Sequence, residues 1–225
     1  MDILTLLNIE TVFFTIWDYP MSYLEFFGTI FTVLSVWYAT RNNVLTWPVG
    51  IVGVILYIFL FYQINLYSDF LEQIYFLITS FIGWWLWIHP RTKAETDIKK
   101  GLKINTNSTF DNIVVVLAIV AGTILMGEIM GNIHVYLPQF FPEPASYPYL
   151  DAFTTILSFV ATILMAKKRI ECWYLWILVD IIGIGLYYVK DVRFIALEYA
   201  LFLILASKGL LDWRKEHKRY TLQEG

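Results

Sequence analysis

Acidic and tryptophan side chains stand inside long apolar stretches, where ionisable groups are rare and usually functional. Asp180 lies in the middle of one stretch, and Glu72 and Glu198 lie in two others. On a helix, Trp173, Trp176 and Asp180 share one face, because they recur at steps of three and four residues. An indole face holds a flat cationic ring with about 0.5–2 kcal/mol per contact. The pattern therefore predicts an interior that attracts a flat organic cation.

A second group of such residues lies in another apolar stretch. Glu72 and Trp87 fall on one helical stripe, and Gln73 and Trp84 run beside it. Trp47 stands at the start of the preceding stretch. Tryptophan is also enriched at membrane–water interfaces, so an aromatic belt is the alternative explanation for all of these tryptophans and the better one for Trp85.

The composition excludes several classes of protein. Of 225 residues, 58% are apolar, 18% aromatic and only 16% charged, with a formal net charge of −3. The mean hydropathy of +0.61 excludes disorder, a nucleic-acid-binding surface and an ordinary cytosolic enzyme. A single cysteine and three scattered histidines give no local metal motif. The sequence predicts no metal, no cofactor and no nucleic-acid partner.

The apolar stretches are long enough to cross a bilayer, which takes about 20 residues of helix. The sequence predicts seven membrane-spanning helices, at approximately 22–40, 44–63, 69–89, 111–130, 149–166, 171–189 and 192–212. Residues 1–21 contain no Lys or Arg, which argues against a cleaved signal peptide and favours a short interfacial helix. Residues 214–225 form a charged tail.

The basic residues predict the orientation, because cytoplasmic loops retain an excess of Lys and Arg. If the N-terminus lies outside, 14 of the 16 basic residues fall on the inner side. Only Lys190 and Arg193 remain outside. We therefore expect the N-terminus outside and the C-terminus in the cytoplasm.

The chain also resembles itself. Shifting it by 126 residues aligns 23–87 with 149–213 and pairs residues of the rarer types: Trp47 with Trp173, Glu72 with Glu198, Gly83 with Gly209, and Trp87 with Trp213. Chance matching of apolar segments is the alternative. A true repeat gives two three-helix units, 22–89 and 149–213, joined by a linker, 90–148, that contains helix 111–130. This 3+1+3 plan orients both repeats the same way and places a substrate between them, near mid-membrane.

Three segments resemble motifs of the PnuC family of bacterial vitamin transporters. They are Gln63–Tyr67, Gly83–Trp87 and Glu171–Trp176, read as QINLY, GWWLW and ECWYLW. The resemblance extends over nearly all the chain. It implies an all-α inner-membrane protein with seven helices in a 3+1+3 arrangement, related to the SWEET sugar transporters and assembled as a homotrimer. It also implies uptake of nicotinamide riboside by facilitated diffusion and trapping by a cytosolic kinase, with thiamine as the alternative substrate.

The same resemblance implies contacts to the substrate from Trp176 and from the residue four positions earlier. That residue is Cys172, where the family usually has Asn, and Glu72 is a second departure from the pattern of a riboside carrier. Together with the acids and tryptophans above, the predicted substrate-binding set is Trp47, Glu72, Gln73, Trp84, Trp87, Glu171, Cys172, Trp173, Trp176, Asp180 and Glu198.

Two other classes of function are weaker. A membrane-embedded enzyme would need a metal cluster or a nucleophile paired with a base, and Cys172 has no histidine near it in the sequence. A scaffold protein would leave the intramembrane acids unexplained. Proton coupling through Asp180 is disfavoured, because a cation requires its carboxylate to be charged.

Overall fold

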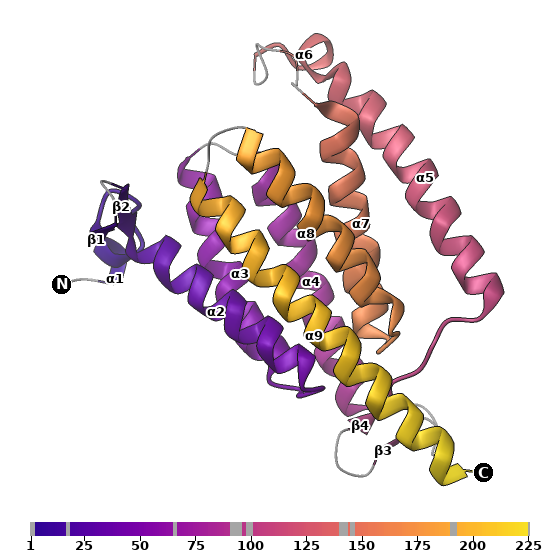
Figure 1. Cartoon of the computed structure of the whole chain (residues 1–225). Coiled ribbons are helices and arrows are strands. Elements are labelled where there is room, and N and C mark those ends of the chain that lie inside the picture. The colour runs from indigo at the N-terminus through magenta and orange to yellow at the C-terminus, as the bar shows by residue number, and fades with distance from the viewer. Residues whose placement is uncertain are drawn as a thin grey trace. The chain divides into compact units, whose positions relative to one another are not determined.

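The computed structural model describes residues 3–16, 19–64, 67–90, 96–97, 101–139, 144, 147–189 and 193–224 (Figure 1). A helix of at least 18 residues lies in each range predicted to span the membrane. These helices are α2 (Tyr23–Thr40), α3 (Thr46–Gln63), α4 (Tyr67–Ile88), α5 (Thr109–Gly131), α7 (Pro148–Ala166), α8 (Glu171–Val189) and α9 (Arg193–Glu224).

Four of these helices are long and apolar enough to cross a membrane by themselves. They comprise α3, Asp69–Ile88 of α4, α5 and α7. The protein is therefore an all-α membrane protein. That all seven helices span, in a 3+1+3 arrangement, stays a prediction.

The N-terminal segment differs from the predicted interfacial helix. Only Ile3–Leu6 is helical (α1), and an antiparallel hairpin follows, formed by β1 (Val12–Ile16) and β2 (Tyr19–Ser22). The physical reason is composition, because Val, Phe, Thr and Ile in β1 are residues that favour strands. The Tyr19 hydroxyl donates to the Glu25 carboxylate, which ties the hairpin to the first turn of α2.

The charged C-terminal tail continues the last helix. α9 runs without a break to Glu224, beyond the predicted end of the last span at residue 212 and through tail residues 214–224. This part of the chain is rich in Lys, Arg, Glu and Leu, which are good helix formers. Lys208 pairs with Asp212 one turn later, a spacing that stabilises helices.

The remaining short elements lie in the connections. They are β3 (Thr96–Asp97) and β4 (Gly101–Leu102), which pair with each other, and α6 (Ile133–Tyr136). Before α5, Ser108 and Asp111 form a capping box in which each side chain binds the other's backbone N–H. The same device, made by Ser22 and Glu25, begins α2.

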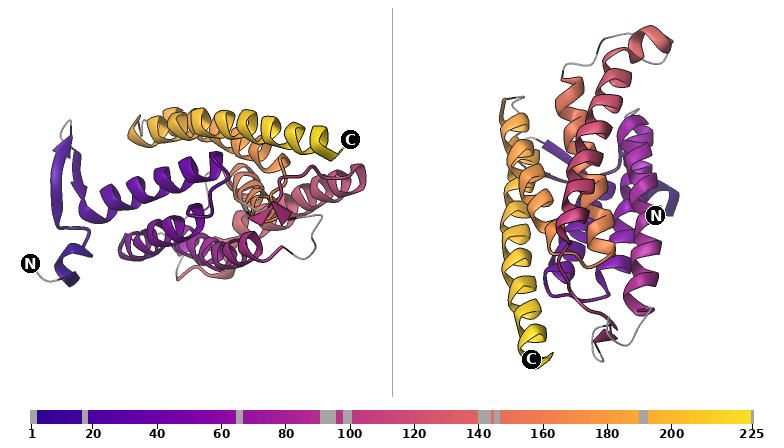
Figure 2. Two further views of the ribbon diagram at one scale, coloured as in Figure 1. Left: turned by 90° about the horizontal axis from the view of Figure 1, so that it is seen from below. Right: turned by 90° about the vertical axis from the view of Figure 1, so that its right-hand side faces the viewer.

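The chain forms two compact units. The first contains Met1–Ile104, Ala166–Lys168 and Ile204–Gly225, and the second contains Asn105–Met165 and Arg169–Leu203. Within the first unit, α3 packs against both α2 and α4 (Figure 2). Within the second unit, the core joins Ile119 of α5, Leu157 of α7 and Val179 of α8. The predicted repeat boundaries remain a prediction.

Two turns support the internal repeat. Among the described residues, the two non-glycine residues with positive φ are Asn42 (52°) and Lys168 (49°), which are 126 residues apart. The backbone N–H of Asn43 donates to Tyr38 over 3.0 Å, and that of Arg169 donates to Leu164 over 2.8 Å, again at the same offset. The turns α2–α3 and α7–α8 therefore have the same local conformation.

Candidate functional site

A cluster of three tryptophans lies in the first unit and contains two of the predicted site residues. Trp87 of α4 meets Trp47 of α3 edge to face, with ring centroids 5.4 Å apart. Trp213 of α9 also packs against Trp87, with centroids 6.1 Å apart. The Trp47 ring approaches α4 closely because residue 83 is glycine, where a Cβ atom would lie 2.4 Å from the ring.

This tryptophan cluster already contains a cation. The Lys168 ammonium lies 4.1 Å from the centroid of the Trp87 ring, and the Lys168 residue is 0% exposed. The turn conformation at residue 168 directs this side chain inward. An aromatic face that holds an ammonium group gains the same cation–π attraction that was expected for a substrate.

Sequence reasoning missed this use of Lys168 and Trp213. Lys168 stands in the run Lys167–Arg169, which was interpreted only as part of the charge that sets the orientation. The predicted repeat could have pointed to these two residues, because Lys168 corresponds to Asn42 and Trp213 corresponds to Trp87. Both Asn42 and Lys168 are buried polar residues at matched turns.

The other predicted residues of α4 are spread along the helix. Glu72 and Gln73 are half-buried and make no hydrogen bond or ion pair with any described residue. Trp84 is half-buried, whereas Trp85 is 53% exposed and stacks on His89. At 1.5 Å per residue, Glu72 lies about 18 Å along the axis from Trp84. A single small substrate therefore does not contact Glu72 and Trp84 at the same time.

The first turn of α8 is anchored to the chain ahead of α5. The Glu171 carboxylate accepts a hydrogen bond from the Asn107 backbone over 3.0 Å. Cys172 and Trp173, the next two residues, are fully buried. This end of α8 is held rigidly, so the residues that follow it are placed by a fixed helix.

Trp176 and Asp180 make the compact part of the predicted site. They are four residues apart on α8, so both side chains fall on one face about 6 Å apart along the axis. Trp176 packs against the core of the second unit. Its indole N–H is buried and has no hydrogen-bond acceptor among the residues that the structure describes.

Asp180 is the most unusual residue of this pair. It is 3% exposed, and no described residue gives it a hydrogen bond or an ion pair. A buried carboxylate without a partner is costly. Within the second unit, Gly183 on the next turn of α8 packs against the Tyr199 ring of α9. Glu198 precedes that tyrosine and is half-buried.

The comparisons with known proteins decide the family. A model of the family described as nicotinamide mononucleotide transporter matches residues 22–215. The chain belongs to this family. It is therefore a bacterial membrane transporter and not an enzyme.

The curated relatives of this protein are named for two different substrates. The nicotinamide riboside transporter PnuC of Escherichia coli K12 is 27% identical over 210 residues, covering 87% of this chain and 86% of the relative. The protein of that name from Neisseria mucosa is 26% identical, covering 98% and 82%. The riboflavin/roseoflavin transporter RibM of Streptomyces davaonensis is 23% identical, covering 92% and 91%.

A solved structure supports the fold of this transporter. The crystal structure of the vitamin B3 transporter PnuC superposes with a TM-score of 0.66 and 24% sequence identity, covering 88% of this chain and 83% of the other. The likeness covers most of both chains.

Proposed function

We propose that this protein takes up nicotinamide riboside across the bacterial inner membrane by facilitated diffusion, after which a cytosolic kinase traps the product. The Escherichia coli and Neisseria relatives with this name support the substrate, since they match most of the chain. Nicotinamide riboside carries a flat pyridinium ring with a permanent positive charge, which is the class of ligand that the intramembrane acids predict.

The observation that carries this proposal is the buried Asp180 carboxylate beside Trp176. A charged carboxylate in an apolar interior is stabilised by a partner of opposite charge, and no described residue supplies one. A pyridinium ring stacked on the Trp176 indole satisfies it. The free indole N–H of Trp176 offers a donor to the ribose hydroxyls.

The other predicted residues take supporting positions in this proposal. Cys172 lies on the same stripe of α8, one turn before Trp176. Glu171 and Trp173 fix the start of that helix, and Trp47 and Trp87 belong to the tryptophan cluster. Four further residues lie outside α8 and attract or guide the cation on its way to the site. They are Glu72, Gln73 and Trp84 of α4 and Glu198 of α9.

We infer that all seven long helices span, in a 3+1+3 arrangement with the N-terminus outside. The matched turns at Asn42 and Lys168 support the repeat. Contacts within the first unit support one part of this topology, which is that segments predicted as cytoplasmic lie on the same side. Trp213 donates to the Ala39 carbonyl over 2.9 Å, and His217 binds the Ile104 carbonyl at 3.2 Å.

We also infer a homotrimer, which mass photometry of the purified protein tests. Most of the surface of α5 is available for contact with a partner subunit or with lipid, because only Ile119 and Gly127 are buried in this helix. A single species with the mass of one chain would contradict the trimer.

The transport step in this proposal is alternating access around the site on α8. For a substrate of charge +1, an inside-negative potential adds about 2.3 kcal/mol of inward bias per 100 mV. No coupling ion is required for uptake under that potential, and phosphorylation keeps the internal riboside concentration low.

Riboflavin is the competing substrate, because the Streptomyces relative is named a riboflavin/roseoflavin transporter. Its ring is flat and neutral, so it gains little from a buried carboxylate. Thiamine, a second flat cation, is compatible with the same chemistry, but no relative reported above carries its name.

A binding titration of the purified protein, followed by its tryptophan fluorescence, tests the proposal. Nicotinamide riboside, thiamine and riboflavin are compared on the same preparation. We expect nicotinamide riboside to bind most tightly. Tighter binding of riboflavin would contradict both the substrate and the role of Asp180.

A further inference from the structure

Charged side chains line a groove of about 540 Å³ in the first unit, on α9 and at the end of α2. Four basic residues face two acidic ones, so two positive charges are in excess. The lining residues are Thr40, Arg41, Lys208, Asp212, Lys215, Glu216 and Arg219. We propose that this groove binds a phosphate group, either of an anionic phospholipid or of a soluble nucleotide.

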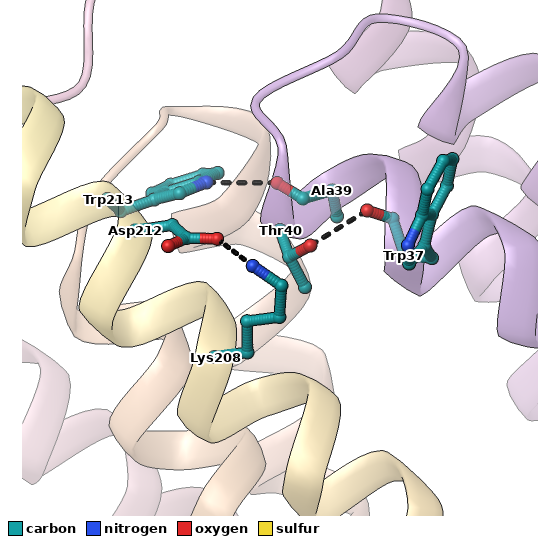
Figure 3. A network of polar contacts seen from close by, with 6 residues as sticks. All are labelled: Trp37, Ala39, Thr40, Lys208, Asp212 and Trp213. Carbon is teal, nitrogen blue, oxygen red and sulfur yellow. Dashed lines mark hydrogen bonds and ion pairs between the residues drawn. The ribbon is translucent and has the colours of Figure 1, made fainter.

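The acidic residues of the groove are already committed to partners. Asp212 pairs with Lys208 (Figure 3). Glu216 accepts hydrogen bonds from Asn42 over 3.1 Å and from Tyr220 over 2.7 Å, and Arg219 lies 3.7 Å from it. These carboxylates therefore leave the remaining basic groups available to an anion.

Arg41 and Lys215 are the two basic groups that remain. The Arg41 guanidinium stacks on the Trp37 ring, 4.0 Å from its centroid. Stacking uses the face of the guanidinium and leaves its N–H groups, whose fork matches the oxygens of a phosphate. Lys215 is exposed and makes no hydrogen bond or ion pair with a residue that the structure describes.

The end of α2 does not oppose a bound anion strongly, although the carbonyl end of a helix carries partial negative charge. Two of its last carbonyls accept hydrogen bonds from side chains (Figure 3). Trp213 donates to the Ala39 carbonyl, and the Thr40 hydroxyl donates to the Trp37 carbonyl over 2.8 Å. Two of the carbonyl oxygens at this helix end are therefore already occupied by side-chain donors.

The position of the groove suits a headgroup as well as a soluble phosphate. Arg41 follows the last turn of α2, and Lys208 begins the charged part of α9. At Arg41 and at Lys208, the apolar part of each helix ends and polar residues begin. Both residues belong to the side predicted as cytoplasmic, which has most of the basic residues. Basic pockets between helices at this level bind the headgroups of anionic lipids.

Native mass spectrometry of the full chain in detergent tests the proposal with three probes, which are phosphatidylglycerol, phosphatidylcholine and ADP. The variants are the double substitution Arg41→Gln with Lys215→Gln, the single substitution Lys215→Gln and the matched control Lys218→Gln. Lys218 is an exposed lysine on the same helix that does not line the groove. Each preparation is checked for helix content by circular dichroism.

We expect the double variant to bind phosphatidylglycerol or ADP about thirtyfold more weakly than the wild type, the loss expected from two basic contacts. We expect Lys215→Gln alone to weaken binding several-fold and Lys218→Gln to leave it unchanged. Preference for phosphatidylglycerol over phosphatidylcholine identifies a lipid, and binding of ADP identifies a soluble phosphate.

Two results would overturn the proposal. One is that the wild type binds neither phosphatidylglycerol nor ADP more tightly than phosphatidylcholine. The other is that Lys215→Gln and Lys218→Gln behave alike, which remains decisive if the double variant does not fold. Nicotinamide riboside binding is a separate measurement, so failure of the uptake proposal does not affect this test.

Discussion

The tryptophan cluster of the first unit and the Trp176–Asp180 pair of the second differ in where their positive charge comes from. Trp87 faces the Lys168 ammonium at 4.1 Å, so the chain itself supplies the cation. Asp180 is buried and no described residue supplies one. An aromatic group that has its own cation stabilises the fold, whereas an acid beside a tryptophan without one suits a charged ligand.

The predicted internal repeat makes the same distinction. Trp87 and Trp213 occupy matched positions and pack together in the first unit. At the same offset, Trp176 and Asp180 correspond to Gly50 and Val54, which have neither an aromatic ring nor a charge. In this predicted repeat, the matched Trp87 and Trp213 pack the bundle, whereas the unmatched Trp176 and Asp180 are the residues proposed to define the substrate.

The largest expected effect is on stability, at the tryptophan cluster. Trp87→Ala removes a fully buried ring and should lower the free energy of unfolding by about 3–5 kcal/mol. Denaturant unfolding in detergent measures the change. Trp85→Ala is the matched control, because Trp85 is 53% exposed and its loss should matter little. Similar losses for both variants would show that Trp87 is not the centre of a packed cluster.

The next effect is on binding, at Asp180. Asp180→Asn keeps the side-chain shape and removes the charge, so nicotinamide riboside should bind about thirtyfold more weakly, or about 2 kcal/mol. Calorimetric titration measures the affinity. Stability should not fall, since the variant removes a buried charge without a partner. Asp151→Asn, at an exposed position of α7, is the control, and equal effects in the two variants would contradict the assignment.

A smaller effect is expected at Trp176. Trp176→Phe keeps an aromatic ring but removes the indole N–H and weakens the cation–π attraction, so affinity should fall about fivefold. The same titration measures it. The neutral ligand riboflavin serves as the internal comparison, because its weaker binding should change less. A larger change for riboflavin than for nicotinamide riboside would show that Trp176 does not contact a cationic ring.

The smallest effect on affinity is expected at Lys168. Lys168→Met keeps much of the side-chain length and removes the resident cation, so riboside binding should stay within about twofold while the cation–π contribution to stability, about 1 kcal/mol, is lost. Titration and unfolding of one preparation measure both. A marked gain in riboside affinity would mean that the substrate takes the place of Lys168 on Trp87.

Much of the fold was predictable from the sequence, because apolar runs end where polar residues begin. α8 has the predicted bounds 171–189, and α2 begins at Tyr23 with a capping box that Ser22 and Glu25 signal. The hairpin before it was not predicted, since its short run of β-branched and aromatic residues also fits an apolar helix. The helical state of the tail was not predicted, because only the apolar part of α9 carries the signal of a membrane span.

The site was predictable only in part. The acid at 180 and the tryptophan at 176 stand out by type and spacing, since charges are rare within apolar helices. The burial of Lys168 was not predictable, because a lysine in a short loop between helices usually faces water, and its inward direction depends on a backbone turn with positive φ. Sequence patterns do not distinguish a cation held by the chain from one supplied by a ligand.

An experimental structure with nicotinamide riboside bound tests the central claim most directly. We expect the pyridinium ring to lie against the Trp176 indole, within reach of the Asp180 carboxylate, and the Lys168 ammonium to stay on the Trp87 ring. A riboside bound on Trp87 in place of Lys168, or an Asp180 carboxylate facing away from the ligand, would contradict it.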